Sequence, residues 1–254
     1  MDGTLLDENK QLSPDFWETE QKLFEKGVLF SVASGRQFYN LIEVFDKIKE
    51  RTLFLAENGT YAYYKGEEIF INPLPKEDAV RCIEIGRTAE GTNLILCGKN
   101  AAYLESKEER FVAEVKKHFS RIEFVDDLTK VDDVVLKVSI CDFRNAELNS
   151  LKYFEHLKSD YKVAISGAIW IDITNLTANK GTAITRIQKE LGISYDETMV
   201  FGDYLNDFEM MGTAKYSYAM KNAHADILEI ASFVTAFDNN NSGVTQTINE
   251  LVFI

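Results

Sequence analysis

The sequence is poor in proline, cysteine and histidine, with three residues of each type in 254. Cys82, Cys97 and Cys141 are an odd number, lack Cys-x-x-Cys spacing, and lie in or beside apolar runs such as "LILC" and "VSIC". This pattern argues against a disulfide framework or a cysteine metal site, and it predicts buried thiols in a reducing cytoplasm. The three histidines are scattered without ligand spacing, so we interpret them as surface or core residues.

Basic residues are also scarce. The chain has 28 Lys and Arg against 41 Asp and Glu, a net charge of -13. This charge repels nucleic acid and anionic lipid, so neither is expected as a partner. A phosphorylated ligand would then require a local cation, either a metal ion or a few placed Lys and Arg residues.

Long apolar runs are absent. No run approaches the roughly 18 residues that a membrane span needs, and no basic-then-apolar leader precedes Asp2. We therefore expect no membrane segment and a cytoplasmic location.

Apolar residues are nonetheless abundant, at 45%, with 12% aromatics, which is enough for one large core or two modest ones. Ser13-Pro14 begins a predicted helix that runs to Lys26, and the apolar run "VLFSVASGR" follows as a buried strand. A helix near Gln37–Lys49 and the strand "TLFLAENGT" repeat the scheme. This alternation predicts an α/β fold with a doubly wound, Rossmann-like parallel sheet.

The alternation is interrupted at "NPLP", which contains two of the three prolines. The next stretch mixes helices, including one predicted from Asn145 to Leu157, with several strands. The α/β pattern resumes after "TNLTANKG". We therefore predict a core at residues 1–74, an inserted α+β cap domain at 75–175, and a second part of the core at 176–254.

Four polar turns follow four predicted strands. Carboxyl ends of parallel strands meet in one crevice, so these turns should converge. Carboxylates there could hold Mg²⁺, and a hydroxyl and a lysine could bind phosphate oxygens, as metal-assisted phosphoryl transfer requires. The turns are Asp2-Gly3-Thr4, Ser34-Gly35-Arg36, Asn58-Gly59, and "GDYLND" with Asp203, Asn206 and Asp207.

Each of these residues also has an ordinary structural interpretation. Asp203 and Asp207 could simply begin a helix, and Ser34 could be a turn residue. Asn58-Gly59 is equally consistent with a hairpin turn and with a ligand contact. Lys180 is different, because a cation at the start of a helix opposes the helix dipole, which favours a functional reason for it.

The motifs together resemble the haloacid dehalogenase-like phosphatases, and more narrowly their Cof-type branch with a large α/β cap (type IIB). "MDGTLL" is similar to the family's first motif, Asp-x-Asp-Gly-Thr, from its second position onward. "SVASGR", "TANKGTAI" and "VFGDYLNDFEMM" look like the second, third and fourth motifs, and "AMKNAHADI" and "NNNSGV" follow. The resemblance covers the whole chain and keeps the motif order.

The resemblance implies a Mg²⁺-dependent phosphatase for small phosphomonoesters, with sugar phosphates as the leading class and an aspartyl-phosphate intermediate. Asp2 would be the general acid/base and would offer its carbonyl to Mg²⁺, while Ser34 and Lys180 would neutralise the phosphoryl group. The implied metal ligands are Asp2, Asp203 and Asp207. The implied substrate contacts are Gly35, Arg36, Asn58 and Asn206.

The family's nucleophile, the first Asp of its first motif, would fall immediately before Met1. We expect this to reflect a misplaced start or a genuine truncated form, and we expect the chain from Met1 to be inactive or nearly so. Two other functions stay open: a non-catalytic protein that binds a phosphorylated metabolite, and a phosphomutase. The chain is expected as a monomer or a homodimer.

Overall fold

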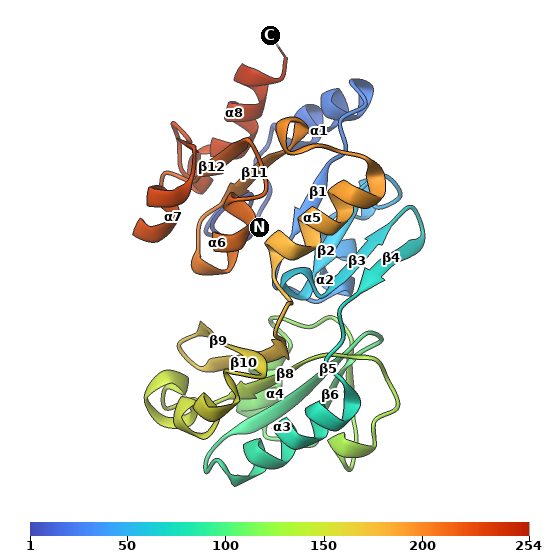
Figure 1. Ribbon diagram of the computed structural model, residues 1–254, viewed down its shortest axis with the longest axis vertical. Coiled ribbons are helices and arrows are strands. Elements are labelled where there is room, and N and C mark those ends of the chain that lie inside the picture. Colours follow the sequence, from blue (N-terminus) through green and yellow to red (C-terminus); the bar gives the residue numbers. More distant parts are fainter. Residues whose placement is uncertain (254) are drawn as a thin grey trace. The chain divides into compact units, whose positions relative to one another are not determined.

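The computed structural model describes residues 1–253 and divides into two compact units (Figure 1). The first unit contains Met1–Gly35, Phe45–Ile69 and the chain from Asn179 onward. The second contains Arg36–Val44 and Phe70–Ala178. Both units combine helices with a sheet, so the predicted α/β class is confirmed. Within residues 1–253, no helix has both the length and the apolar character needed to cross a bilayer.

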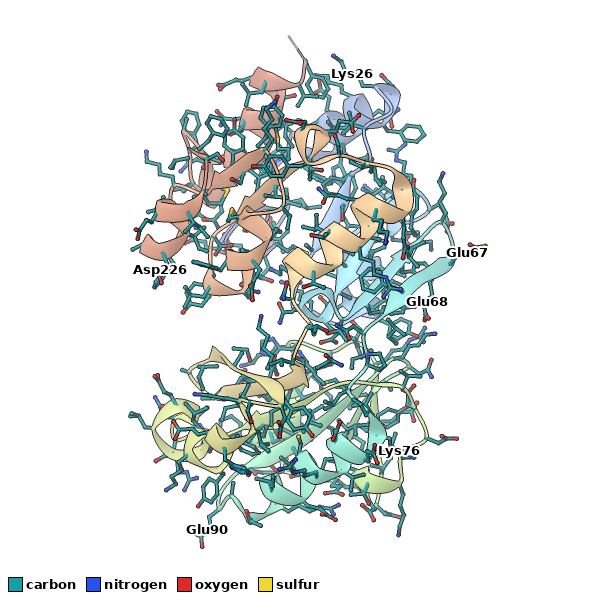
Figure 2. All side chains as sticks on the ribbon, viewed as in Figure 1. Lys26, Glu67, Glu68, Lys76, Glu90 and Asp226 are labelled. Atoms are coloured by element: carbon teal, nitrogen blue, oxygen red, sulfur yellow. The ribbon has the colours of Figure 1, made fainter. Side chains whose placement is uncertain are left out.

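The first unit contains a sheet in the order β1-β2-β3-β4. Its strands are Ser31–Ala33, Leu53–Ala56, Tyr61–Tyr64 and Glu67–Ile71. β1 and β2 are parallel, whereas β3 returns antiparallel to β2. All four residues of β2 are buried, as its continuous apolar sequence predicts for a strand covered on both faces. β4 is the outer edge, and its Glu67 and Glu68 side chains are exposed (Figure 2).

A second sheet in the same unit has the order β11-β12-β13, and its strands are all parallel. These strands are Met199–Gly202, Tyr216–Ala219 and Phe233–Val234. The parallel strands of the core thus lie in two sheets, and among residues 1–253 neither β1 nor β11 has a strand on its second side. The Met1 carbonyl accepts hydrogen bonds from the Leu5 and Leu6 amides at 2.9 Å, which closes a tight turn.

α5 begins and ends at signals that the sequence carries, whereas α1 begins at Phe16, after the predicted start at Ser13-Pro14, without a side-chain cap. The Asn179 side chain accepts a hydrogen bond from the Thr182 amide at 2.7 Å and so caps α5. Gly192 ends α5 in the left-handed region, at φ +67°, and Gly27 follows α1 at φ +72°. The helices are α1 Phe16–Glu25, α5 Lys180–Leu191, α6 Phe208–Met211, α7 Ala225–Ile230 and α8 Gly243–Leu251.

The second unit is built on a six-stranded sheet in the order β7-β6-β5-β8-β10-β9. Its strands are β5 Asn93–Gly98, β6 Ala102–Leu104, β7 Ile122–Phe124, β8 Val135–Cys141, β9 Tyr161–Gly167 and β10 Trp170–Asn175. Its helices are α2 Phe38–Val44, α3 Lys76–Thr88 and α4 Glu109–Val115. Every residue of β8 is buried, and β8 side chains enter two separate apolar clusters, one containing Val138 and the other Cys141. The three cysteines are buried free thiols, as predicted.

The stretch predicted as one helix from Asn145 to Leu157 is not a continuous α-helix. It forms a π-helical turn at Ala146–Ser150 and then two 3₁₀ turns. The Asn145 side chain accepts from the Leu148 amide at 2.9 Å, and the Ser150 hydroxyl donates to the buried Asp142 carboxylate. Such side-chain hydrogen bonds compete with regular helix formation.

Candidate active site

The turns that follow β1, β2 and β11 are joined by hydrogen bonds. The Ser34 carbonyl, just after β1, accepts from the Asn58 amide at 2.8 Å. Asn206 lies in the turn after β11. Its side-chain Nδ2 atom donates to the Asn58 side-chain oxygen at 3.0 Å. Asn58 has φ +57°, a conformation that asparagine tolerates better than most residues. A Cβ atom on Gly35 would lie 3.0 Å from the Asn58 side chain, so this position suits glycine.

The N-terminal turn packs directly against Asp203. The Thr4 hydroxyl donates to the Asp203 carboxylate. Gly3 has φ +69°, and a Cβ atom there would lie only 2.2 Å from Asp203 Oδ2. Position 3 therefore requires glycine for two reasons: the positive φ angle and the lack of space for a Cβ atom.

A buried ion pair lies beside Asp203. The Lys180 Nζ atom, at the start of α5, donates to Asp207 Oδ1 at 2.6 Å. The side chains are only 3% and 4% exposed. Asp207 Oδ2 accepts from the Asp203 amide at 3.0 Å, so one carboxylate connects the lysine to the turn after β11.

The two carboxyl groups have pKa values shifted in opposite directions. Burial raises the pKa of Asp203, and the hydrogen bond from Thr4 only partly offsets this. Burial also raises the pKa of Asp207, but the charge of Lys180 outweighs it and holds that pKa below its ordinary value. Asp203 is thus the carboxylate whose charged form is disfavoured mainly by burial, and a bound cation would favour that charged form.

Two predicted site residues have other partners. The Asp2 carboxylate pairs with Lys10 Nζ at 2.9 Å, and its side chain is 38% exposed. Arg36 belongs to the second unit, where its guanidinium donates to Asn40 Oδ1 at 3.1 Å. All the predicted site residues except Arg36 belong to the first unit: Asp2, Ser34, Gly35, Asn58, Lys180, Asp203, Asn206 and Asp207.

Sequence reasoning missed several residues that hold the N-terminal turn. Thr4 belongs to the first polar turn but is not among the predicted site residues, yet it is buried and its hydroxyl donates to Asp203. The Asn222 side chain donates to the Gly3 carbonyl at 2.8 Å and accepts from the Asn239 amide at 3.2 Å. Asn239 in turn donates to the Leu6 carbonyl at 2.9 Å. These asparagines lie in the polar turns "AMKNAHADI" and "NNNSGV", but nothing in the turns themselves indicates their distant partners.

The donor set fits Mg²⁺. Within residues 1–253 there is no group of three or more His, Cys, Asp and Glu side chains that could hold a metal ion. Mg²⁺ does not need one, because it is commonly held by one or two carboxylates together with water and substrate phosphate oxygens. Asp203 offers such a carboxylate, and its amide and side chain lie beside the buried Lys180–Asp207 pair.

Comparison with known proteins places the chain in a family. The family model for haloacid dehalogenase-like hydrolase matches residues 1–248. The 5-amino-6-(5-phospho-D-ribitylamino)uracil phosphatase YbjI of Escherichia coli is 31% identical over 99% of this chain and 94% of its own length. The putative phosphatase YxeH of Bacillus subtilis is 26% identical over 99% of this chain and 96% of its own. The chain belongs to the haloacid dehalogenase-like hydrolases and is by family an enzyme.

Solved structures agree on the fold. SMU.1108c from Streptococcus mutans has a TM-score of 0.89 and 27% identity, covering 100% of this chain and 97% of its own. The structure described as the HAD subclass IIB sugar phosphatase BT4131 has a TM-score of 0.83 at 21% identity, covering 100% of this chain and 97% of its own, which compares the fold alone. These neighbours match the predicted fold class.

Proposed function

We propose that this chain carries the active site of a Mg²⁺-dependent phosphatase for small phosphomonoesters. The observation that carries the proposal is the buried Lys180–Asp207 pair beside Asp203, at the ends of parallel strands. A lysine buried this deeply, bound to one carboxylate and next to a second, suits a site that must bind both a cation and an anion.

Each residue would have a role that follows from its chemistry. Asp203 would hold Mg²⁺, which would neutralise charge on the phosphoryl oxygens. Lys180 would contribute a fixed positive charge, and Asp207 would keep its ammonium group oriented. Ser34 would donate a hydrogen bond to a phosphate oxygen, and Asp2 would protonate the leaving oxygen after releasing Lys10.

The insert predicted at residues 75–175 would act as the cap that selects the substrate. Support comes from the second unit, which has its own sheet and apolar core and so can vary independently of the catalytic turns. The substrate class would be sugar phosphates or similar small phosphorylated metabolites. Three buried thiols support the cytoplasm as the compartment.

A direct test measures release of inorganic phosphate from an aryl phosphate and from a panel of sugar phosphates, with and without Mg²⁺. The resemblance places the nucleophilic Asp directly before Met1, so two forms are compared: the chain from Met1, and a form carrying an apolar strand that ends in Asp ahead of Met1. We expect turnover from the longer form and little from the shorter.

Asp203→Asn in the longer form should lower turnover by about 100-fold or more, because the metal loses its carboxylate. Asp226→Asn, on exposed α7 (Figure 2), is the matched control and should leave turnover unchanged. If neither form turns over any substrate but a sugar phosphate raises the melting temperature, the protein binds its ligand without catalysis. Transfer of label between substrate molecules, without release of phosphate, would instead identify a phosphomutase.

A further inference from the structure

The turn Glu57–Gly59, directly after β2, has an unusual backbone. Its three residues all have positive φ, at +50°, +57° and +86°. Residues other than glycine rarely adopt this left-handed region, because their Cβ atom meets the following carbonyl oxygen. A strained turn persists only where its surroundings hold it, and such strain is found mostly at functional sites.

One side of this left-handed turn contacts the two polar turns described above. The Asn58 amide donates to the Ser34 carbonyl at 2.8 Å, and the Asn58 side-chain oxygen accepts from Asn206 at 3.0 Å. The buried Thr60 hydroxyl closes the left-handed turn by donating to the Glu57 carbonyl at 2.8 Å. The backbone at residue 58 is therefore held against the carboxyl ends of β1 and β11.

The other side of the left-handed turn lies against the start of α5. A Cβ atom on Gly59 would meet the Asn179 carbonyl oxygen at 2.6 Å and Ala183 Cβ at 2.9 Å. The same Asn179 carbonyl accepts from the Ala183 amide at 3.2 Å, which is the hydrogen bond that opens the helix. Gly59 therefore contacts the backbone group at which α5 begins.

This contact places the backbone of Lys180, which directly follows Asn179. The Lys180 Nζ atom lies 2.6 Å from Asp207 Oδ1, and both side chains are almost completely buried. A cation at the start of a helix opposes the helix dipole, so the helix itself does not favour the ammonium group there. Packing around the start of α5 must therefore hold Lys180 in place.

Close packing of α5 would by itself explain a glycine at position 59. It does not explain why Glu57 and Asn58 are also left-handed, since neither is the residue that approaches the helix. Their conformation lets the Asn58 amide and side chain bind the β1 and β11 turns while Gly59 meets α5. The strain is thus connected to the joining of three elements of the site.

We propose that Gly59 is a positioning residue for the phosphoryl site, because the left-handed turn sets the distance between Ser34 and Lys180. Gly59 itself contacts no substrate. The proposal rests on the proposed function, in which Ser34 and Lys180 bind oxygens of one phosphoryl group. Two groups that bind a single small anion tolerate little change in their separation, and a shift of about 1 Å can cost about 100-fold in rate.

The test compares Gly59→Ala with the parent chain by calorimetric titration, first with Mg²⁺ alone and then with inorganic phosphate at saturating Mg²⁺. In Gly59→Ala the new Cβ atom must displace Asn179, and Lys180 moves with it. Phosphate should bind about tenfold more weakly or worse, as expected when a hydrogen bond to a charged group is lost. The Mg²⁺ affinity, which depends on Asp203, should stay unchanged.

Gly66→Ala is the matched control. Gly66 has φ +84°, and nothing lies within 4 Å of the new Cβ atom, so the change imposes the same backbone strain without crowding a neighbouring element. It should change neither affinity. Unchanged phosphate affinity in Gly59→Ala would overturn the proposal. An equal fall in the phosphate and Mg²⁺ affinities would also overturn it, since general damage to the site would then be the cause.

A second measurement does not depend on any ligand. The Thr182 and Ala183 amides both donate to Asn179, so Gly59→Ala should speed their hydrogen exchange and leave later amides of α5 unchanged. Unchanged exchange, beside a parent chain that binds phosphate, would refute positioning by Gly59 alone. Faster exchange, beside a parent chain that binds no phosphate, would refute the proposed function and with it the assignment of Gly59 to a phosphoryl site.

The parent chain also provides a measurement that needs no folded variant. One phosphate ion that spans Ser34 and Lys180 fixes the two ends of the left-handed turn together. Phosphate at saturating Mg²⁺ should therefore slow hydrogen exchange at the Asn58 and Ala183 amides by similar factors. Slower exchange at only one of these amides would contradict the proposal.

Discussion

Lys180 and Asp207 form a buried ion pair, with side chains that are only 3% and 4% exposed. Removing one partner leaves the other charge buried without compensation, which costs about 3 to 5 kcal/mol in comparable pairs. Lys180→Met should therefore lower the free energy of unfolding by about 3 kcal/mol or more. Urea unfolding, followed by tryptophan fluorescence, measures this loss.

The double variant Lys180→Met/Asp207→Asn supplies the control. The carboxamide oxygen introduced by Asp207→Asn could still accept the hydrogen bond from the Asp203 amide, so the double variant should be clearly more stable than Lys180→Met alone. Lys22→Met, which breaks an exposed helical pair with Glu18, should change stability by no more than about 0.5 kcal/mol. Equal losses in the single and double variants would show that the ion pair is not the cause.

Gly3 is the residue whose substitution should damage the site most selectively. In Gly3→Ala the new Cβ atom would meet Asp203 Oδ2 at 2.2 Å, so the carboxylate must move. Gly66→Ala imposes the same kind of backbone strain, at φ +84°, with nothing within 4 Å of the new atom. Both should lose about 1 kcal/mol of stability through strain. Mg²⁺ affinity, measured by calorimetry, should fall in Gly3→Ala alone; a fall in both variants would mean that strain elsewhere is enough.

Only some residues of the candidate site could be predicted from the sequence. Asp203, Asp207 and Lys180 could be named as candidates because each is a charged residue in a turn next to an apolar strand or helix. Thr4 and Asn222 could not, because neutral polar residues are common in turns and nothing local marks their partners. Thr4 binds a residue 199 positions away, and Asn222 binds one 219 positions away.

At the scale of elements, the end of β8 is held by a hydrogen-bonded carboxylate. The fully buried Asp142 side chain accepts from the Arg144 side chain at 2.9 Å and from the Ser150 hydroxyl. Burial alone would raise the pKa of Asp142, but Arg144 and Ser150 outweigh it and lower the pKa to about 2. This carboxylate therefore fixes the non-helical segment after β8 to the sheet.

A pH dependence follows from that lowered pKa. A carboxyl group whose pKa falls on folding stabilises the folded state above its unfolded pKa, near 4, and loses this contribution as the pH falls through its folded pKa. Asp142→Asn should therefore cost about 2 kcal/mol at pH 6, and the difference from the parent should shrink to roughly half near pH 3. Urea unfolding at each pH, in a Trp17→Phe background that leaves Trp170 in the second unit, measures it. A difference that stays constant with pH would contradict the assignment.

Helices and strands were predictable where local chemistry and tertiary packing agree. α5 has a capping asparagine at its start and a glycine at its end, and β2 is a continuous apolar run. The segment from Asn145 to Leu157 has a helical sequence pattern, yet it forms short turns, because Asn145 and Ser150 make side-chain hydrogen bonds that the pattern does not reveal.

At the scale of the whole molecule, the predicted parallel core lies in two sheets. Strand sequences indicate which residues are buried, but not which strands become neighbours, since pairing depends on what occupies the adjacent position. β1 lies in one of these sheets and β11 in the other. Both strands line a cavity in the first unit that no local pattern predicts.

That cavity predicts an order of unfolding. The second unit packs both faces of β8 against apolar clusters, with Phe111 and Phe154 completely buried. The first unit contains a partly open cavity of about 640 Å³, and the apolar side chains that line it lack packing partners on that side. Each unit has one tryptophan, Trp17 in the first and Trp170 in the second. Two single-tryptophan variants, Trp170→Phe and Trp17→Phe, can therefore follow the units separately.

We expect the Trp17 signal to change at a urea concentration lower by about 1 M or more than the Trp170 signal, since small domains lose about 1 to 3 kcal/mol of stability per molar urea. Both variants must first show the circular dichroism and melting profile of the parent chain. Coincident transitions would mean that the units unfold as one body and that the cavity does not limit the first unit. A Trp170 transition at the lower concentration would place the weaker packing in the second unit, against the distribution of buried side chains.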